Sequence, residues 1–302
     1  MNRNALIEKL NDAETLANGP ISKRLLAVGF RYLSFQWLKR IVYPLVKKGK
    51  LSNAQLFFGQ NMKVKLPAGS DLFLLGAKTH VSEIRLAKFL INHLESDMHF
   101  LDIGAHFGYF SMLAAALTGK NGKVVSLEAS RNIYQILSSN TAKCTQCKAI
   151  HAAAGPSNGM VRFYDFPLLF SEYNTIEKDQ YTNESWKSSI QAEETEVNMY
   201  SLNALIDQEN INPSIIKIDV EGAEAKVLQG LDLTSSQKPI IIFEYIKNKP
   251  QEGLESVLNE YATYYELRLM NEFGEAGEVI DLKNSEQLQK LMDSENLILL
   301  PR

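Results

Sequence analysis

Between residues 99 and 244, short apolar segments alternate with segments of helical periodicity, and no other feature of the chain limits its fold as strongly. Strands are predicted at 99–103, 123–128, 148–153, 215–219 and 239–244. Helices are expected at about 108–117, 131–141, 222–228 and 254–261, and two further strands near 266–270 and 297–300. Repeats of this kind build parallel sheets covered by helices on both faces. The sequence therefore predicts an α/β protein.

Residues 1 to about 60 are predicted to form a helical N-terminal extension, followed by a Rossmann-like domain at 61–302. After Gly19-Pro20, a basic amphipathic segment runs from 21 to 46. Such a segment can dock on its own protein, form an oligomer or lie on a membrane surface. We expect docking or homo-oligomer formation through these helices, with membrane association disfavoured.

The composition excludes several classes of protein. With 45% hydrophobic and 22% charged residues, the chain is typical of globular proteins, and its net charge of −3 gives no global attraction to nucleic acid. Two cysteines, Cys144 and Cys147, cannot form a disulfide framework or complete a zinc site. A C-x-x-C pair could be redox-active, but we interpret the two as small residues at the end of a helix before a strand. The N-terminal residues show no signal-peptide pattern and no apolar run is long enough to span a bilayer, which favours a cytoplasmic location.

About sixty residues separate the third and fourth predicted strands. Within this insertion, 156–200, residues 161–164 and 194–200 are predicted to be antiparallel strands around a polar loop at 166–190. A long loop of this composition is typical of a lid or a binding loop.

The first strand is followed by Asp102-Ile103-Gly104-Ala105-His106-Phe107-Gly108, which then opens a helix. Glycines at such a turn let a ligand approach the backbone. A dinucleotide fingerprint would place glycine where His106 stands, and both that side chain and the charge of Asp102 would oppose a pyrophosphate. The turn instead suits a cofactor with a cationic amino group and no phosphate, such as S-adenosylmethionine. A nicotinamide-dependent oxidoreductase is the alternative from another class.

Acidic residues follow three of the predicted strands. Glu128 ends the second strand, where an acid binds ribose hydroxyls. Asp219 and Glu221 follow the fourth strand and Glu244 ends the fifth, so all should meet at the carboxyl edge of the sheet. Glu224 falls in a first helical turn, where an acid also suits the helix dipole.

These motifs resemble those of the FkbM-type methyltransferase family. The first motif is 100–111, the second Ser126-Leu127-Glu128-Ala129, the third 216–224 with Val227-Leu228-Gln229-Gly230, and the fourth 239–244. The family often has proline where Ala129 stands. The resemblance covers about residues 80–250 and implies a class I methyltransferase fold with a seven-stranded sheet containing one antiparallel strand.

The resemblance implies S-adenosylmethionine-dependent O-methylation of a sugar, a glycan or a small metabolite. Alternatives are an N-methyltransferase and a non-catalytic cofactor-binding module. We predict Asp219, Glu221 and Glu244 to be catalytic, without a metal, although three acids could also hold a divalent cation. The predicted cofactor-binding residues are Glu83, Asp102, Gly104, Ala105, His106, Phe107, Gly108, Tyr109, Phe110, Glu128, Ala129, Ala153 and Asp219. The remaining histidines, His80, His93, His99 and His151, are expected on the surface or in packing roles.

Overall fold

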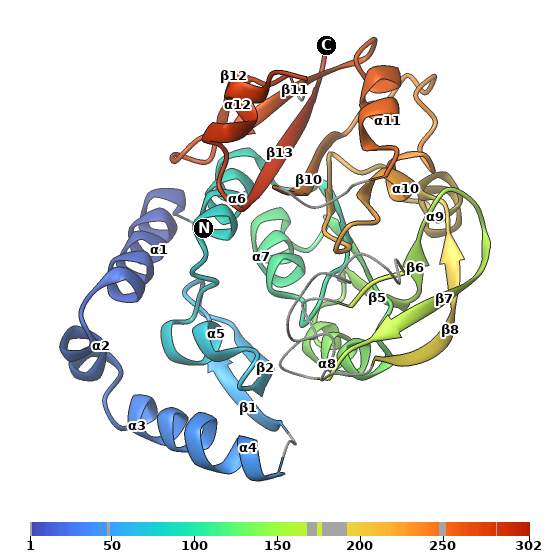
Figure 1. The fold of residues 1–302 in the computed structure, drawn as a ribbon. Helices are drawn as coiled ribbons and strands as arrows, with labels where there is room; N and C mark the ends of the chain where they lie inside the picture. Colours follow the sequence, from blue (N-terminus) through green and yellow to red (C-terminus); the bar gives the residue numbers. More distant parts are fainter. Residues whose placement is uncertain (1, 47–48, 168–173, 177–191, 248–251, 282) are drawn as a thin grey trace.

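An eight-stranded sheet lies at the centre of the computed structural model, which describes residues 2–46, 49–167, 174–176, 192–247, 252–281 and 283–302 (Figure 1). The strand order is β12-β11-β13-β10-β9-β3-β4-β5. The strands are β3 (His99–Ile103), β4 (Lys123–Glu128), β5 (Cys147–His151), β9 (Ile215–Ile218), β10 (Ile240–Ile246), β11 (Tyr265–Met270), β12 (Ala276–Val279) and β13 (Ser294–Pro301).

Strands β5, β4, β3, β9 and β10 are parallel neighbours, and β13 runs antiparallel between β10 and β11. These seven strands form the mostly parallel sheet with one antiparallel strand that the sequence predicts. The short strand β12 adds an antiparallel edge beyond them. It was not predicted, because its sequence, Ala-Gly-Glu-Val, carries little strand propensity of its own.

Helices cover both faces of the sheet. Side chains of successive strand residues point to opposite faces, so Phe100 and Ile215 belong to one hydrophobic core while Leu101 and Ile216 belong to the other. The first core includes α6 (Val81–His93), α7 (Tyr109–Thr118) and α8 (Arg131–Thr141). The second includes α9 (Leu202–Glu209), α10 (Glu224–Leu228) and α11 (Leu254–Tyr261). Burial on both faces explains the continuous apolar strands of the sequence.

The predicted insertion forms a separate three-stranded sheet. Strand β8 (Glu193–Tyr200) pairs antiparallel with β7 (Gly159–Asp165), as expected, and parallel with the two-residue β6 (Ala153–Ala154). The third predicted strand therefore ends at His151, since the chain after it leaves the central sheet to join β8. Of the polar loop predicted at 166–190, residues 168–173 and 177–190 lie outside the described residues.

The N-terminal helices are α1 (Arg3–Asn18), α2 (Ile21–Val28), α3 (Phe30–Trp37), a π-helical turn (Leu38–Val42) and α4 (Tyr43–Val46). Helix α1 packs on α6: Leu6, Leu10 and Ala13 are buried, and Arg3 donates hydrogen bonds to the carbonyls of Asn92 and Leu94. Gly29, with a φ of 60°, separates α2 from α3. None of the helices in the described part of the chain is long and apolar enough to cross a membrane.

The prediction that residues 1–60 are entirely helical is wrong at its end. Strand β1 (Lys50–Gln55) pairs antiparallel with β2 (Asn61–Leu66), and α5 (Ser70–Leu75) follows. The sequence of β1 has little apolar alternation, because only Ala54 faces the core, and its shape comes from pairing with β2. The division of the chain into 1–60 and 61–302 stays a prediction.

The two cysteines also differ from the interpretation made from the sequence. Cys144 and Cys147 form a disulfide in the turn between α8 and β5. Their Cα atoms lie 5.2 Å apart, within the range that a disulfide spans. The turn places the side chains of Cys144 and Cys147, three positions apart in the sequence, close enough to bond.

Candidate functional site

A cavity of about 660 Å³ opens at the carboxyl ends of β3, β4, β9 and β10, where open α/β sheets bind ligands. Ten of the residues predicted from the sequence line it: Glu83, Gly104, His106, Phe110, Glu128, Ala129, Ala153, Asp219, Glu221 and Glu244. Five do not, namely Asp102, Ala105, Phe107, Gly108 and Tyr109, all of them in or beside the turn after β3.

The turn after β3 is packed directly against the end of β9. Gly104 has a φ of 74°, and a Cβ atom on it would lie 1.8 Å from the carbonyl oxygen of Asp219. Gly108 has a φ of 91°, and its Cβ would lie 2.6 Å from Cδ1 of Leu137. Both positions therefore need glycine, Gly104 because two backbones meet there and Gly108 because α8 packs on the turn.

A buried lysine in β9, which sequence reasoning missed, organises the charges at this edge. Lys217 is 2% exposed, and its Nζ lies 3.3 Å from Oδ1 of Asp102 and 3.2 Å from Oδ2 of Asp219. It also donates a hydrogen bond to the carbonyl of Gly104 at 3.2 Å. Burial alone would lower the pKa of Lys217, but the two carboxylates outweigh it and raise the pKa above its ordinary value. Lys217 is therefore a fixed cation.

Asp102 has a different position from the one expected. Its side chain is fully buried, accepts a hydrogen bond from Ser111 Oγ at 2.6 Å and pairs with Lys217, its neighbour across the β3–β9 pair. Ser126 in turn donates to Ser111 at 2.8 Å. Asp102 therefore does not line the cavity and meets its edge only through Lys217, so its part in cofactor binding stays a prediction.

Glu128 lies at the end of β4 with its carboxylate fixed by the backbone. One oxygen accepts from the N–H of His106 at 2.9 Å and the other from the N–H of Ser130 at 2.8 Å. Burial raises the pKa of Glu128 to about 7, and the two hydrogen bonds oppose part of that rise. Since each carboxylate oxygen has a second lone pair, Glu128 can still accept hydrogen bonds from a ligand in the cavity.

His106 lines the cavity in its neutral form. Its φ is 49°, and its ring lies 3.9 Å from the ring of Phe107 between centroids. Burial, together with the charges of Lys78 and Lys217, lowers the pKa of His106 well below its ordinary value. The imidazole therefore adds no positive charge to the cavity at neutral pH.

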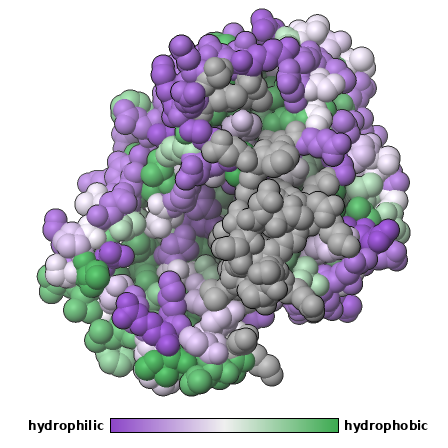
Figure 2. All heavy atoms as spheres, in the orientation of Figure 1, coloured by the Kyte–Doolittle hydropathy of each residue, from purple (hydrophilic) through white to green (hydrophobic). Residues whose placement is uncertain are grey.

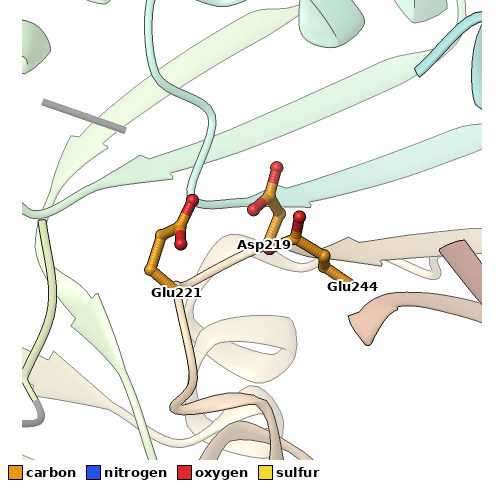
Figure 3. A group of neighbouring side chains, drawn as sticks. All are labelled: Asp219, Glu221 and Glu244. Carbon is orange, nitrogen blue, oxygen red and sulfur yellow. The ribbon is translucent and has the colours of Figure 1, made fainter. Parts of the chain in front are cut away.

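Three acids meet at the ends of β9 and β10. Figure 3 shows the side chains of Asp219, Glu221 and Glu244 directed toward one another, and one carboxylate oxygen from each lies within 4.8 Å of the others. Glu221 takes a left-handed backbone conformation, with a φ of 54°, in the turn after β9. This convergence was predicted from the strand ends, and its geometry could also hold a hard cation.

The carboxyl group of Glu244 is also perturbed by burial. Oε1 accepts a hydrogen bond from Ser294 Oγ at 2.7 Å, while Oε2 is buried without a hydrogen-bond partner among the described residues. Burial, followed by the charges of Asp219 and Glu224, raises the pKa of Glu244 well above its ordinary value. A carboxyl group with a raised pKa binds protons more readily than an exposed one.

Glu224 is a buried acid that binds the backbone of the turn after β9. It is 1% exposed, and its Oε1 accepts hydrogen bonds from the N–H groups of Val220 and Gly222, both at 3.1 Å. Burial raises its pKa to about 7 against these hydrogen bonds. Glu224 therefore stabilises the turn that carries Glu221 through direct hydrogen bonds. The sequence had suggested only an interaction with the helix dipole.

Segments without a clear sequence pattern complete the cavity. Before α6, Lys78 forms an ion pair with Glu83 at 2.7 Å, and His80 shares a hydrogen bond with Ser82 at 2.7 Å. His80 is exposed, as expected from the sequence, and its side chain also lines the cavity. Asn174 also lines it, from the described part of the insertion loop. The other three histidines contact neighbouring protein groups outside the cavity, as expected.

Comparison with known proteins identifies one domain. The model of the methyltransferase FkbM domain matches residues 102–282, more than half of the chain. A search of curated protein sequences finds no significant match.

Three solved structures are reported from those that are similar to this chain. Precorrin-6Y C5,15-methyltransferase from Geobacter metallireducens has 14% identity and a TM-score of 0.37, over 74% of this chain and 87% of its own. Fibrillarin from Aeropyrum pernix, with bound S-adenosyl-L-methionine, has 9% identity and a TM-score of 0.37, over 72% and 74%. The O-methyltransferase from Bacillus cereus, in complex with SAH, has 16% identity and a TM-score of 0.36, over 72% and 79%.

The raised pKa of Glu224 predicts how stability depends on pH. The folded protein binds this proton more tightly than the unfolded chain, whose glutamates titrate near 4.5, so the free energy of unfolding falls as the pH rises from about 4.5 to about 7. Glu224→Gln keeps an acceptor for the two amides but cannot ionise. We expect the variant to lack about 3 kcal/mol of that fall in urea titrations. Parallel pH profiles for the two proteins would contradict the assignment.

Proposed function

This chain belongs to the FkbM methyltransferase domain family, and from that premise we propose that it methylates a hydroxyl oxygen of a sugar, a glycan or a small metabolite. S-adenosylmethionine is the proposed methyl donor. The observation that carries the proposal is the convergence of Asp219, Glu221 and Glu244 in one cavity with Glu128. Methyl transfer to a hydroxyl needs a pocket that can bind the positively charged donor and a group that accepts the hydroxyl proton. The carboxylates of this cavity can serve both purposes.

The cavity fits S-adenosylmethionine by its size and by the chemistry of its donor groups. A volume of about 660 Å³ is within the range of cofactor sites. Glu128 offers fixed carboxylate oxygens for the ribose hydroxyls, and Ala129 and Ala153 give a small apolar wall beside them. The acids at the far strand ends suit a sulfonium and an ammonium group.

The same charges disfavour the nicotinamide alternative. A pyrophosphate in this cavity would face carboxylates at the ends of β4, β9 and β10, and the turn after β3 has His106 where a dinucleotide site needs glycine. Lys217 does not change this balance, because it is already engaged by Asp102 and Asp219. The charge distribution therefore favours a cationic ligand.

Bound S-adenosylmethionine would supply an electrophilic methyl group. We assign the residues of the chain to three tasks: Glu128 binds, Asp219 orients and Glu244 accepts the proton of the acceptor hydroxyl. Glu244 has a raised pKa and a buried Oε2 with no hydrogen-bond partner among the described residues, which suits a proton acceptor. Asp219 is held by Lys217 and is partly exposed to the cavity, so it can align an acceptor.

We favour a mechanism without a metal. Asp219 already has a cation, Lys217 Nζ, at 3.2 Å, and Glu244 Oε1 is hydrogen-bonded to Ser294. Because Lys217 already compensates the charge of Asp219, the three acids attract a second cation less strongly than three uncompensated carboxylates would. Retention of activity in chelator supports this mechanism, and loss that magnesium reverses would replace it by metal-assisted transfer.

The polar groups around the cavity favour a hydroxyl-rich acceptor. Ser82, Asn174, Thr175 and Asn296 line it together with the acids. Side chains that both donate and accept hydrogen bonds match the alternating hydroxyls of a sugar. The acceptor class and transfer to oxygen, as well as a cytoplasmic location, are proposals that rest on this complementarity and on the sequence.

The first test concerns the cofactor. We predict micromolar binding of S-adenosylmethionine or its demethylated product, about −7 to −8 kcal/mol by calorimetry. Glu128→Ala should weaken binding by about 1–3 kcal/mol, because hydrogen bonds to a charged group are lost. Glu260→Ala, at an exposed acid on α11, is the matched control and should bind normally. If the protein bound NAD but neither S-adenosylmethionine nor its demethylated product, the proposal would be overturned.

The second test concerns the chemical step. With an acceptor found by screening sugars, glycans and metabolites against labelled S-adenosylmethionine, Glu244→Gln should lower kcat by about 10²–10⁴-fold while cofactor affinity changes little. Asp219→Asn should also lower kcat more than it weakens cofactor binding. Near-normal turnover in both variants at saturation would remove their catalytic roles, and a methylated nitrogen in the product would reassign the reaction to N-methylation.

A further inference from the structure

Most of the large apolar side chains exposed in the described part of the molecule lie in one segment. Nine of thirteen are in residues 21–46, and their exposed fractions range from 38% to 86%. They are Ile21, Leu25, Leu26, Phe30, Leu33, Trp37, Ile41, Leu45 and Val46. Figure 2 shows hydrophobic residues gathered along the lower edge of the molecule, where Figure 1 places α3 and α4. Exposed apolar surface of this extent marks an interaction site.

The exposed residues of α3 to α4 follow one side of a helix. Phe30, Leu33, Trp37 and Ile41 are spaced by three or four residues, which places them in a row. Phe35 and Leu38 between them, and Tyr43 after them, are buried against the rest of the protein. The segment therefore docks on its own protein, as expected, through the side that carries Phe35, Leu38 and Tyr43. The opposite side, which carries the exposed row, faces solvent.

The same part of the chain has a charge opposite to that of the whole. Residues 15–70 contain ten of the 32 lysines and arginines and none of the 35 aspartates and glutamates, although the chain has a net charge of −3. Lys23, Arg31, Lys39, Arg40 and Lys50 are exposed. A local excess of cations attracts an anionic surface and repels a cationic one.

We propose that the exposed side of residues 21–46, which we call the basic apolar face, binds the surface of an anionic lipid bilayer. The helices would lie in the plane of the interface, with the row of Phe30, Leu33, Trp37 and Ile41 in the headgroup region and the lysines and arginines near lipid phosphates. Long basic side chains can cover apolar surface while their charged ends stay in water. The proposal is independent of the reaction catalysed.

Charge complementarity favours lipid over a second copy of the chain. In a two-fold symmetric dimer the same patch would face itself, so cations would meet cations with no acid from 15–70 to compensate. Like charges across an interface cost free energy. An anionic bilayer compensates the charges and covers the apolar row at once. The exposed Leu51, beside Lys50 in β1, extends the same chemistry beyond α4.

The test uses the full-length protein and unilamellar vesicles, either of pure phosphatidylcholine or with about one third phosphatidylglycerol. We expect cosedimentation with the anionic vesicles and weak binding to the neutral ones, reduced as NaCl rises from about 0.1 to about 0.5 M. In a Trp186→Phe background Trp37 is the only tryptophan, and its emission should shift to the blue on the anionic vesicles.

Two pairs of substitutions separate the contribution of the apolar side chains to vesicle binding from that of the basic side chains. Phe30→Ser with Ile41→Ser should lower the partition coefficient at least about tenfold by removing apolar contact. Lys23→Glu with Arg40→Glu should lower it by a similar factor on anionic vesicles only.

The controls match each pair at exposed positions elsewhere. Phe273→Ser replaces a 68% exposed phenylalanine and Lys120→Glu an exposed lysine, and both variants should bind vesicles normally. All variants should keep wild-type thermal midpoints and affinity for S-adenosylhomocysteine. Absence of vesicle binding overturns the proposal, as does a dimer in which Trp37 is shielded without lipid. Equal loss in the controls also overturns it, because binding would then not depend on this face.

Discussion

The buried cation Lys217 connects the fold of this protein to its site. It lies between Asp102 of β3 and Asp219 at the end of β9, at 3.3 and 3.2 Å, and also binds the carbonyl of Gly104. Each of these three groups belongs to a part of the backbone that meets at the cavity. Because an unpaired charge inside a protein is costly, the ion pairs fix the relative positions of the two strands and of the turn after β3.

This network also explains how several acids can share a small volume. Asp102 and Asp219 form ion pairs with Lys217, whereas Glu128, Glu224 and Glu244 lie in places where burial raises their pKa values. The site thus contains acids in two kinds of environment, one paired with a cation and one in which burial favours the protonated form. The basic N-terminal region provides the opposite charge at another part of the molecule, which separates ligand binding from surface attachment.

The sequence predicts the central sheet well because strands covered on both faces must be apolar, and it locates the acids because parallel strands end at one edge. Lys217 could not be identified in this way, since a lysine within a strand normally indicates solvent exposure. Lys78 and Asn174 reach the cavity from segments without periodicity, and β1 forms through pairing with β2. Features set by tertiary contacts are those that local patterns miss.

The most direct measurement of the central role of Lys217 is a double-mutant cycle in the free energy of unfolding, with Lys217→Met, Asp102→Asn and both together. Lys217→Met alone should cost about 3–5 kcal/mol, because it leaves Asp102 buried without a counter-charge. Adding Asp102→Asn should recover part of that loss, with a coupling energy of at least about 1 kcal/mol. Two small costs that add to within about 0.5 kcal/mol would show that the strands and the turn are held without this cation.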